Sequence, residues 1–395
     1  MEQQHDIIIV GIQPWDIEIG SNCKNMALEL SKKNRVLYVN PALDIITAYK
    51  GKQNPAVRKR LEVIKGKLNW LNKVNENLWE FNPPVLLNSI NWLPNALFPI
   101  ANRRNNYLFA KAIKAVIAEL NLKNFIVIND SDMFRSFYLK DYLQPLKYIY
   151  YTRDNLMTVP YWSKHGKKHE PSLMRKSDLI LGNSTHLISY AKQYNNNSFY
   201  IGQGCDLSMF SESDVNFKPK DISNIYSTII GYTGLLTGRR LDIALIQHIA
   251  KTRLDWNIVL IGPEEEDFKK SDLHNLPNVH FLGNKSPEDL PLYIQHFDIC
   301  INPQIVNDLT LSNYPRKIDE YLAMGKPVVA TDTPTMEIFK DCVYLAKSKQ
   351  MFVELIEVAI NENSAEFIKM RKDLANSHSW EECINKLWDA FANTK

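Results

Sequence analysis

The chain has 395 residues, of which 45% are hydrophobic and 23% are charged, as in ordinary soluble globular proteins. No apolar run approaches the ~20 residues of a membrane span and no signal-peptide layout is present, so we expect a cytoplasmic protein of two domains. The net charge of +3 is unevenly spread: residues 1–205 hold 27 Lys and Arg against 16 Asp and Glu, and residues 206–395 hold 20 against 28. A basic first half (+11) and an acidic second half (−8) indicate different partners.

The first half alternates strands and helices. Residues 6–40 read as a strand, a Gly- and Ser-bearing loop, a helix and a second strand, a unit that implies a parallel sheet covered by helices. Further elements follow the same rhythm: strands at 125–130, 148–152, 179–184 and 199–204, and helices at 105–120 and 186–194.

The second half repeats this alternation after a polar stretch without periodicity, residues 205–224. We predict strands at 227–234, 257–263, 279–284, 298–304 and 327–332, and helices at 242–252, 288–297 and 315–324. The prediction is therefore an α/β protein with two tandem, doubly wound, Rossmann-like domains. Ligands of such sheets bind at the carboxyl ends of the strands, so a central cleft between the domains is the expected site.

The last helix carries aromatic residues at helical spacing and needs a surface to pack on, for which we predict the first domain. The predicted organisation is a first domain, a linker, a second domain and a returning helix, with the limits 1–205, 206–224, 225–376 and 377–395.

Residues 50–73 carry eight Lys or Arg against the single Glu62, and the residues that follow are rich in Trp, Leu and Pro. Basic residues interleaved with apolar ones suit the surface of an anionic membrane. A solvated basic helix explains the same pattern. Nucleic acid is the weakest alternative because no DNA- or RNA-binding motif accompanies the charge.

Three loops of the second half lie at predicted strand ends. The loop 231–242 brings Gly234, Arg240 and Asp242, and the turn 260–263 brings Gly262; glycines let the backbone approach a ligand, and an arginine can bind a diphosphate. In the stretch 312–334, a helix N-terminus and its basic first turn favour an anion. The side chains gathered there are Thr310, Ser312, Asn313 and Lys317. The plain alternative is a surface helix with an Arg316–Glu320 pair.

Neither half has a G-x-G-x-x-G or G-x-x-x-x-G-K-[ST] motif, so a standard dinucleotide fingerprint and a P-loop are both missing. The five cysteines form no CxxC pair and lie far apart, so the residues indicate reduced thiols and no zinc site.

With these motifs the chain resembles the GT4-like glycosyltransferases of the GT-B fold. The segments that carry the resemblance are "PNVHFLGNKSPEDLPLYIQHFDICINP" and "YPRKIDEYLAMGKPVVATDTP", with "GYTGLLTGRRLD" and "NIVLIGP" in the same domain. "PWDIEIGSNCKNMALELSKKNRVLYVNP" is similar to the N-terminal domain of bacterial cell-surface polysaccharide transferases, including the teichuronic-acid-type group.

The resemblance implies that Glu320 binds the ribose of a donor nucleotide. Thr310, Ser312 and Asn313, helped by Lys317 and Arg240, would hold its diphosphate. The family often carries a second glutamate eight positions earlier, where this chain has Ser312, which leaves the donor sugar and the retaining or inverting outcome open. No metal is expected, because GT-B enzymes typically need none, and no other cofactor.

On the acceptor side, Asp154 corresponds to a conspicuous aspartate of relatives and is our candidate base, with structural pairing to Arg153 as the alternative. His165 and His169 are rivals that more often lie at the surface. Glu170 is similar to a glutamate that opens the following helix in the family. The first loop supplies further acceptor-side candidates: Trp15, Asp16, Gly20 and Ser21.

The resemblance thus implies a hexosyltransferase-type enzyme, peripheral to the inner face of the membrane, that moves a sugar from a UDP- or GDP-sugar to a lipid-linked glycan. Alternatives within enzymes are a nucleotide-sugar epimerase, a phosphorylase and a nicotinamide oxidoreductase. From a different class, a non-catalytic nucleotide-sugar binder in a glycan assembly complex also fits.

Overall fold

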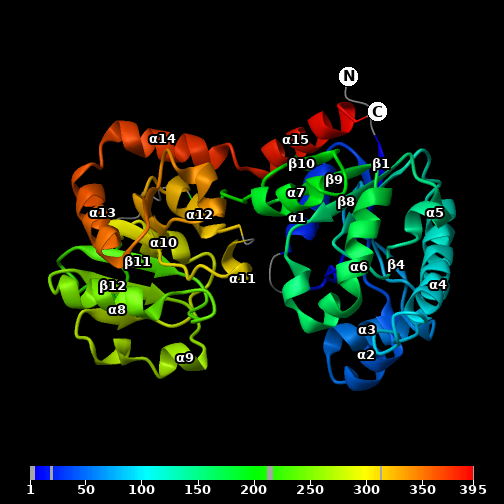
Figure 1. The fold of residues 1–395 in the computed structure, drawn as a ribbon, viewed down its shortest axis with the longest axis horizontal. Coiled ribbons are helices and arrows are strands. Elements are labelled where there is room, and N and C mark those ends of the chain that lie inside the picture. The colour runs from blue at the N-terminus through cyan, green and yellow to red at the C-terminus, as the bar shows by residue number, and fades with distance from the viewer. Residues whose placement is uncertain (1–4, 18–20, 211–216, 312–313, 395) are drawn as a thin grey trace. The chain divides into compact units, whose positions relative to one another are not determined.

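The computed structural model describes residues 5–17, 21–210, 217–311 and 314–394. Its contacts divide the chain into two compact units, residues 1–203 with 383–395, and residues 204–382 (Figure 1). Each unit is built around a mainly parallel sheet with helices on it. The predicted fold class, two parallel α/β domains in tandem, is therefore confirmed.

The first unit has an eight-stranded sheet in the order β10-β9-β8-β7-β1-β2-β5-β4, parallel except for the β4–β5 pair. Its strands are β1 (Asp6–Val10), β2 (Arg35–Val39), β4 (Leu71–Lys73), β5 (Leu78–Phe81), β7 (Ile126–Asp130), β8 (Lys147–Thr152), β9 (Leu179–Gly182) and β10 (Ser198–Tyr200). A small two-stranded sheet pairs β3 (Leu43–Asp44) with β6 (Leu86–Leu87). The central strands are apolar and fully buried, as parallel strands covered on both faces must be.

The helices of the first unit include two short ones after β3 and a long one that precedes β7. They are α1 (Asn22–Leu30), α2 (Ile45–Lys50), α3 (Pro55–Ile64), α4 (Phe98–Glu119), α5 (Leu139–Leu143), the 3-10 turn η1 (Leu156–Thr158), α6 (Pro160–Lys176) and α7 (Thr185–Lys192). α4 begins seven residues before the predicted 105, and Pro99 suits its first turn, where a missing N–H costs nothing.

The second unit has a six-stranded parallel sheet in the order β13-β12-β11-β14-β15-β16. Its strands are β11 (Ile229–Thr233), β12 (Asn257–Ile261), β13 (Val279–Phe281), β14 (Ile299–Asn302), β15 (Val328–Thr331) and β16 (Tyr344–Ala346). Alternate residues of β12 enter different cores: Ile258 and Leu260 pack on one face and Val259 and Ile261 on the other. The sheet is thus covered on both faces, which is the doubly wound arrangement.

Helices and 3-10 turns connect these strands. They are α8 (Ile243–Thr252), α9 (Glu266–Lys269), η2 (Asp272–Asn275), α10 (Leu290–Ile294), α11 (Asp308–Leu311), α12 (Lys317–Ala323), η3 (Pro334–Phe339), α13 (Lys349–Asn361) and α14 (Ala365–Asn376). Sequence reasoning had not placed α13, although its Ser348 caps the first turn by accepting from Met351 N–H at 3.1 Å.

The last helix, α15 (Trp380–Ala392), packs its C-terminal part on the first unit (red in Figure 1). Trp388 stacks on His5 with ring centroids 5.3 Å apart, and Lys147 lies 5.1 Å from the ring centroid of Phe391. Burial among these rings lowers the pKa of His5. Among the helices in the described ranges, none combines the length and the apolar character needed to cross a bilayer.

Candidate active site

At the carboxyl edge of the second sheet, two glycine turns pack backbone against backbone. Gly234 follows β11 with φ of 131° and Gly262 follows β12 with φ of 146°, conformations that side chains with a Cβ rarely adopt. A Cβ on Gly262 would lie 2.0 Å from the Gly234 carbonyl oxygen. A Cβ on Gly234 would lie 2.9 Å from Lys317 Nζ. Both positions therefore require glycine, and the Lys317 ammonium lies close to Gly234.

Lys317 begins α12 and reaches back to β11. Its ammonium donates a hydrogen bond to the Tyr232 hydroxyl and lies 3.9 Å from the centroid of that ring. A second hydrogen bond connects β11 and α12: Thr233 N–H donates to the Tyr321 hydroxyl at 2.8 Å. No ion pair of Lys317 occurs among the residues that the structure describes, so its charge is available to an anionic ligand.

Glu320 lies one helical turn after Lys317 and is only 9% exposed. Its Oε1 is 3.5 Å from Arg316 Nε, so the ion pair of the plain interpretation is present. Burial raises the pKa of Glu320, while the charges of Arg316 and Lys317 oppose that shift. A largely buried carboxylate next to two cations at a strand-end edge is an arrangement typical of functional sites.

Three other residues were predicted to bind the donor nucleotide. Two of them make hydrogen bonds within the protein, and the third is exposed. Thr310 is buried; its hydroxyl accepts from Asn307 N–H at 3.0 Å and donates to the Ile305 carbonyl. Asp242 caps α8 by accepting from Leu245 N–H at 2.9 Å. Arg240 has an exposed side chain. Ser312 and Asn313 lie outside the described residues, so the predicted diphosphate loop is only partly visible.

In the first unit, the carboxyl ends of β7 and β8 hold a buried ion pair that sequence reasoning missed. Asp130 is 0% exposed, and its two carboxylate oxygens accept from Arg153 Nε at 2.7 Å and Nη2 at 3.3 Å. Arg153 also donates to Gln13 Oε1 at 3.1 Å, from the loop after β1. Burial lowers the pKa of Arg153, but Asp130 outweighs it, so that the pKa lies above its ordinary value.

The candidate base Asp154 is attached to this pair. Its Oδ2 accepts from Arg153 Nη1 at 3.1 Å, and its side chain is 51% exposed. Asp154 therefore has the exposed carboxylate that a base needs, and it is also paired with Arg153 as in the structural alternative. The available signal for Asp130 was an acidic residue at the end of a predicted strand, "FIVIND".

Glu170 does not open a helix, in contrast to the family pattern: it lies in the interior of α6. It is buried and accepts from the Tyr150 hydroxyl at 2.8 Å, and burial raises its pKa. Asp154 and Glu170 both line a cavity of about 340 Å³ in the first unit. The two carboxylates therefore face one space.

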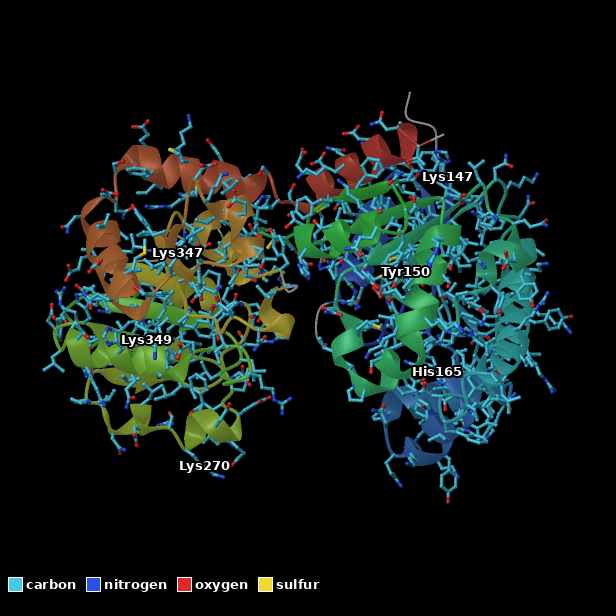
Figure 2. All side chains as sticks on the ribbon, in the orientation of Figure 1. Lys147, Tyr150, His165, Lys270, Lys347 and Lys349 are labelled. Carbon is cyan, nitrogen blue, oxygen red and sulfur yellow. The ribbon has the colours of Figure 1, made fainter. Side chains whose placement is uncertain are left out.

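The two rival histidines do not have the surface placement that we expected of such residues. His165 (labelled with Tyr150 in Figure 2) is buried and stacks on Phe98 at 3.9 Å between centroids; its Nε2 contacts the Asn91 carbonyl at 3.0 Å. His169 is partly buried, and its Nδ1 contacts the His165 carbonyl at 3.1 Å. Burial lowers the pKa of both. They pack the interior between α4 and α6.

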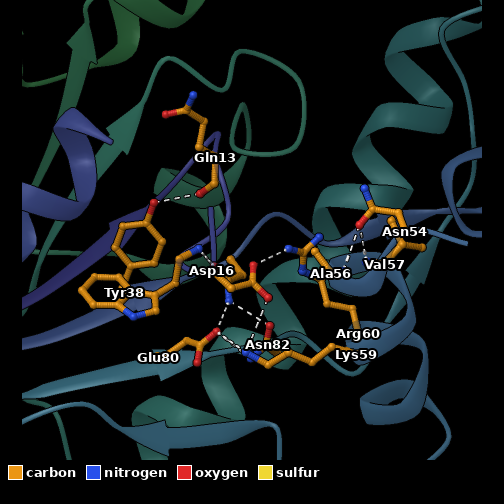
Figure 3. Close-up of polar contacts among 12 residues, drawn as sticks. Gln13, Asp16, Tyr38, Asn54, Ala56, Val57, Lys59, Arg60, Glu80 and Asn82 are labelled. Atoms are coloured by element: carbon orange, nitrogen blue, oxygen red, sulfur yellow. Dashed lines mark hydrogen bonds and ion pairs between the residues drawn. The ribbon is translucent and has the colours of Figure 1, made fainter. Parts of the chain in front are cut away.

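The loop after β1 is held by a polar network (Figure 3). Trp15 N–H donates to Asn40 Oδ1 at 2.6 Å, and the Trp15 ring contacts Tyr38 edge-on at 5.1 Å. Asp16 pairs with Arg60 at 3.0 Å and with Lys59 at 3.5 Å. Two of the eight basic residues in 50–73 are therefore structural partners of this loop.

The network continues through buried side chains on β5 and directly after β2 and β5. Asn40 donates to Glu80 Oε1 at 2.9 Å and to Asn82 Oδ1 at 2.8 Å, and Lys59 lies 3.2 Å from the same Glu80 oxygen. Ser21 precedes α1, is 1% exposed and has a hydroxyl without a hydrogen-bond partner in the described structure. Gly20 lies outside the described residues.

Within the described ranges, no group of three or more His, Cys, Asp or Glu side chains is arranged to hold a metal ion.

Comparison with solved structures identifies the fold. Over 98% of this chain and 100% of the other, the structure matches Anabaena HepE in complex with UDP, with a TM-score of 0.67 and 15% identity. It also matches the sucrose-phosphate synthase of Thermosynechococcus elongatus over 98% of both chains, with a TM-score of 0.65 and 13% identity. The fold is that of the GT-B glycosyltransferases.

Sequence comparison then gives the family of the second unit. Residues 228–362, which contain Gly234, Gly262, Lys317 and Glu320, match the family of glycosyl transferases group 1. The chain is also 31% identical over 187 residues to TuaH of Bacillus subtilis (strain 168), which is named for a glycosyltransferase of teichuronic acid biosynthesis. That match covers 46% of this chain and 47% of TuaH, so the chain spans about half the length of this relative.

Proposed function

We propose that this protein is a glycosyltransferase that moves a sugar from a nucleoside diphosphate sugar to a glycan acceptor. The observation that carries the proposal is the strand-end edge of the second unit. There two required glycines, a Lys317 ammonium with no carboxylate partner among the described residues, and the buried Glu320 carboxylate occur in a segment that matches the group 1 transferases. HepE, which shares the fold, was solved with UDP, and this supports UDP as the first donor base to test.

Each donor-side residue has a role that follows from its chemistry. The Glu320 carboxylate can accept from the two vicinal hydroxyls of a ribose, and such hydrogen bonds would compensate for the burial that raises its pKa. Lys317, whose ammonium has no carboxylate partner in the described residues, neutralises the diphosphate, and the exposed Arg240 can add a second cation. The backbone at Gly234 and Gly262 admits the ligand closely.

On the acceptor side, Asp154 accepts the proton of the attacking hydroxyl. Its carboxylate is half-exposed and is held by Arg153, which is itself fixed by the buried Asp130. This chain of ion pairs orients the base while leaving it accessible to a substrate.

The acceptor is a lipid-linked glycan of a surface polysaccharide, and the protein works at the inner face of the membrane. The similarity to TuaH supports the pathway. On the first unit, exposed apolar side chains lie on α2, before α4 and in its first turn, among them Ile45, Tyr49, Trp92 and Ile100. Exposed basic residues in the same segments would add attraction to anionic lipid.

The donor site is tested by thermal unfolding with UDP, GDP, ADP, CMP, dTDP and NAD. A ligand at 100 times its dissociation constant stabilises by about 2.7 kcal/mol, and we expect one nucleoside diphosphate to do so. The stabilisation should disappear in Glu320→Gln and persist in the matched control Glu337→Gln, an exposed carboxylate of the same unit. Stabilisation by NAD alone, or by no nucleotide, would contradict the proposal.

Turnover of the identified donor, including slow hydrolysis without acceptor, separates an enzyme from a nucleotide-sugar binder. Asp154→Asn should abolish transfer while the nucleotide still stabilises the protein. Peripheral attachment is tested by sedimentation with anionic vesicles at low salt. If the protein stays in the supernatant, the membrane part of the proposal is wrong.

A further inference from the structure

Asp319, one position before Glu320, is a buried carboxylate that has no role in the donor site described above. It is 0% exposed, and its two oxygens lie 2.7 Å from the Tyr314 hydroxyl and 2.7 Å from His378 Nδ1. Burial raises the pKa of Asp319, and its contacts with His378 and Tyr314 oppose that shift. A carboxylate is stable in an apolar interior only where its partners compensate for the lost water, so this cluster is a specific arrangement.

The hydrogen bonds of the cluster indicate which groups carry its protons. The Tyr314 hydroxyl donates its single proton to Asp319 Oδ2. A proton on His378 Nδ1 satisfies both contacts of that nitrogen, to Asp319 Oδ1 at 2.7 Å and to the Tyr314 hydroxyl oxygen at 3.2 Å. His378, with a side chain only 10% exposed, is therefore a donor to the buried carboxylate.

The cluster connects the donor-site helix α12 to the segment that follows α14. α14 packs along α12, and His378 comes two residues after the end of α14 (Figure 1). Beyond the other end of α12, Arg371 of α14 donates through Nη1 to the Gly325 carbonyl at 3.2 Å. α12 is thus held at its first turn by His378 and after its last turn by Arg371.

These contacts decide how α12 is rotated about its axis. The helix has only seven residues, and helices of that length are unstable without tertiary contacts. Asp319 and Tyr321 are about 200° apart around the helix, so they anchor nearly opposite sides of it. Tyr321 accepts from Thr233 N–H of β11, and Asp319 pairs with His378. Glu320, which lies between the two anchors, is therefore turned in one fixed direction.

We propose that His378 is a positioning residue of the donor site. Through Asp319 it holds α12 in the orientation at which Glu320 and Lys317 reach the nucleotide. The inference rests on the proposed function, because it concerns the affinity of that same site. A pair that only stabilised the fold would change the unfolding temperature, but it would not change the affinity of the folded protein for its nucleotide.

The test is titration of the full chain with UDP, GDP, ADP and dTDP, at a temperature well below the unfolding transition of each variant. His378→Leu should weaken binding of the tightest nucleotide by about ten- to hundredfold, the range found when an orienting hydrogen bond to a ligand-binding side chain is removed. His378→Asn should restore most of this affinity, because its amide places an N–H at the position of Nδ1.

The matched control is His280→Leu, which removes a partly buried imidazole from β13 of the same unit. His280 Nε2 contacts Asn257 Oδ1 at 2.8 Å, and Asn257 lies at the amino end of β12, whereas the donor site is at the carboxyl edge. We expect this variant to lose stability and to keep the affinity of the wild-type protein.

The outcomes are separable. If His378→Leu lowers the unfolding temperature but binds the nucleotide as tightly as the wild-type protein, the pair is only structural and the inference is wrong. Equal loss of affinity in His378→Leu and His378→Asn overturns it as well, because the N–H donor would then not matter. A wild-type protein that binds none of the four nucleotides contradicts the proposed function itself.

Tyr314→Phe decides the question if His378→Leu does not fold. It removes one hydrogen bond to Asp319 and leaves His378 in place, so it should weaken nucleotide binding by about two- to tenfold. Unchanged affinity in this variant would overturn the inference.

Discussion

The buried ion pair of the first unit allows a quantitative prediction. Arg153→Met keeps most of the side-chain volume but removes the guanidinium that gives Asp130 two hydrogen bonds, at 2.7 and 3.3 Å. Ile12 N–H, at 3.3 Å, and the Cys23 side chain would still contact that carboxylate, but neither carries a positive charge. Asp130 is 0% exposed, so water cannot replace the lost partner without local opening.

Removal of one partner of a buried pair costs about 3–5 kcal/mol, because an uncompensated charge remains in the interior. For a unit of this size, about 2–4 °C is lost per kcal/mol, so the unfolding temperature of the first unit should fall by roughly 6–20 °C. The double variant Asp130→Asn/Arg153→Met leaves no buried charge and should recover much of this loss.

The assay is calorimetry of the single and double variants, in which each unit's transition is followed separately because two units need not unfold together. Asp154→Asn is the control: it also removes a partner of Arg153, but from an exposed position, where an ion pair contributes about 0–1 kcal/mol. If Arg153→Met destabilises no more than Asp154→Asn does, the pair is solvated and the reasoning fails.

Two further predictions concern single residues. Gly262→Ala should destabilise the second unit by at least the ~1–3 kcal/mol of a strained backbone, and it should weaken nucleotide binding. The control Gly283→Ala is also at positive φ, but nothing lies within 4 Å of its added Cβ, so it should leave binding unchanged. Urea unfolding and nucleotide titration compare the two variants, and equal effects would contradict the packing argument. Glu170 has a folded-state pKa above its unfolded value, so its stabilising contribution is complete below the unfolded pKa and is lost as the pH rises through the folded pKa. Glu170→Gln, whose amide oxygen can still accept from Tyr150, should therefore raise the unfolding temperature at neutral pH and leave it unchanged in acid; a destabilised variant at pH 7 would show that the ionised form is the one that the fold prefers.

The sequence by itself determined the central strands of both sheets and the motifs of the second unit that carry the family resemblance. The alternation of apolar strands and amphipathic helices reports how each segment is buried, which is a local property, and it was enough to predict two parallel α/β domains. Gly234 and Gly262 could be predicted for the same reason, because a turn at the end of a buried strand is a local feature of the sequence. Glu320 was identified from the sequence motif that surrounds it.

Tertiary structure alone decided which side chains meet. Asp130 lies opposite Tyr151 because β7 and β8 are neighbours in the sheet, and this register brings Arg153 to it. Asp16 pairs with Arg60, which is 44 residues away in the sequence. A cavity of the first unit that Trp92 lines is formed by segments that follow four different strands. Strand order and register follow from the free energy of packing the whole sheet and its helices, to which every element contributes, so no local pattern along the chain encodes them.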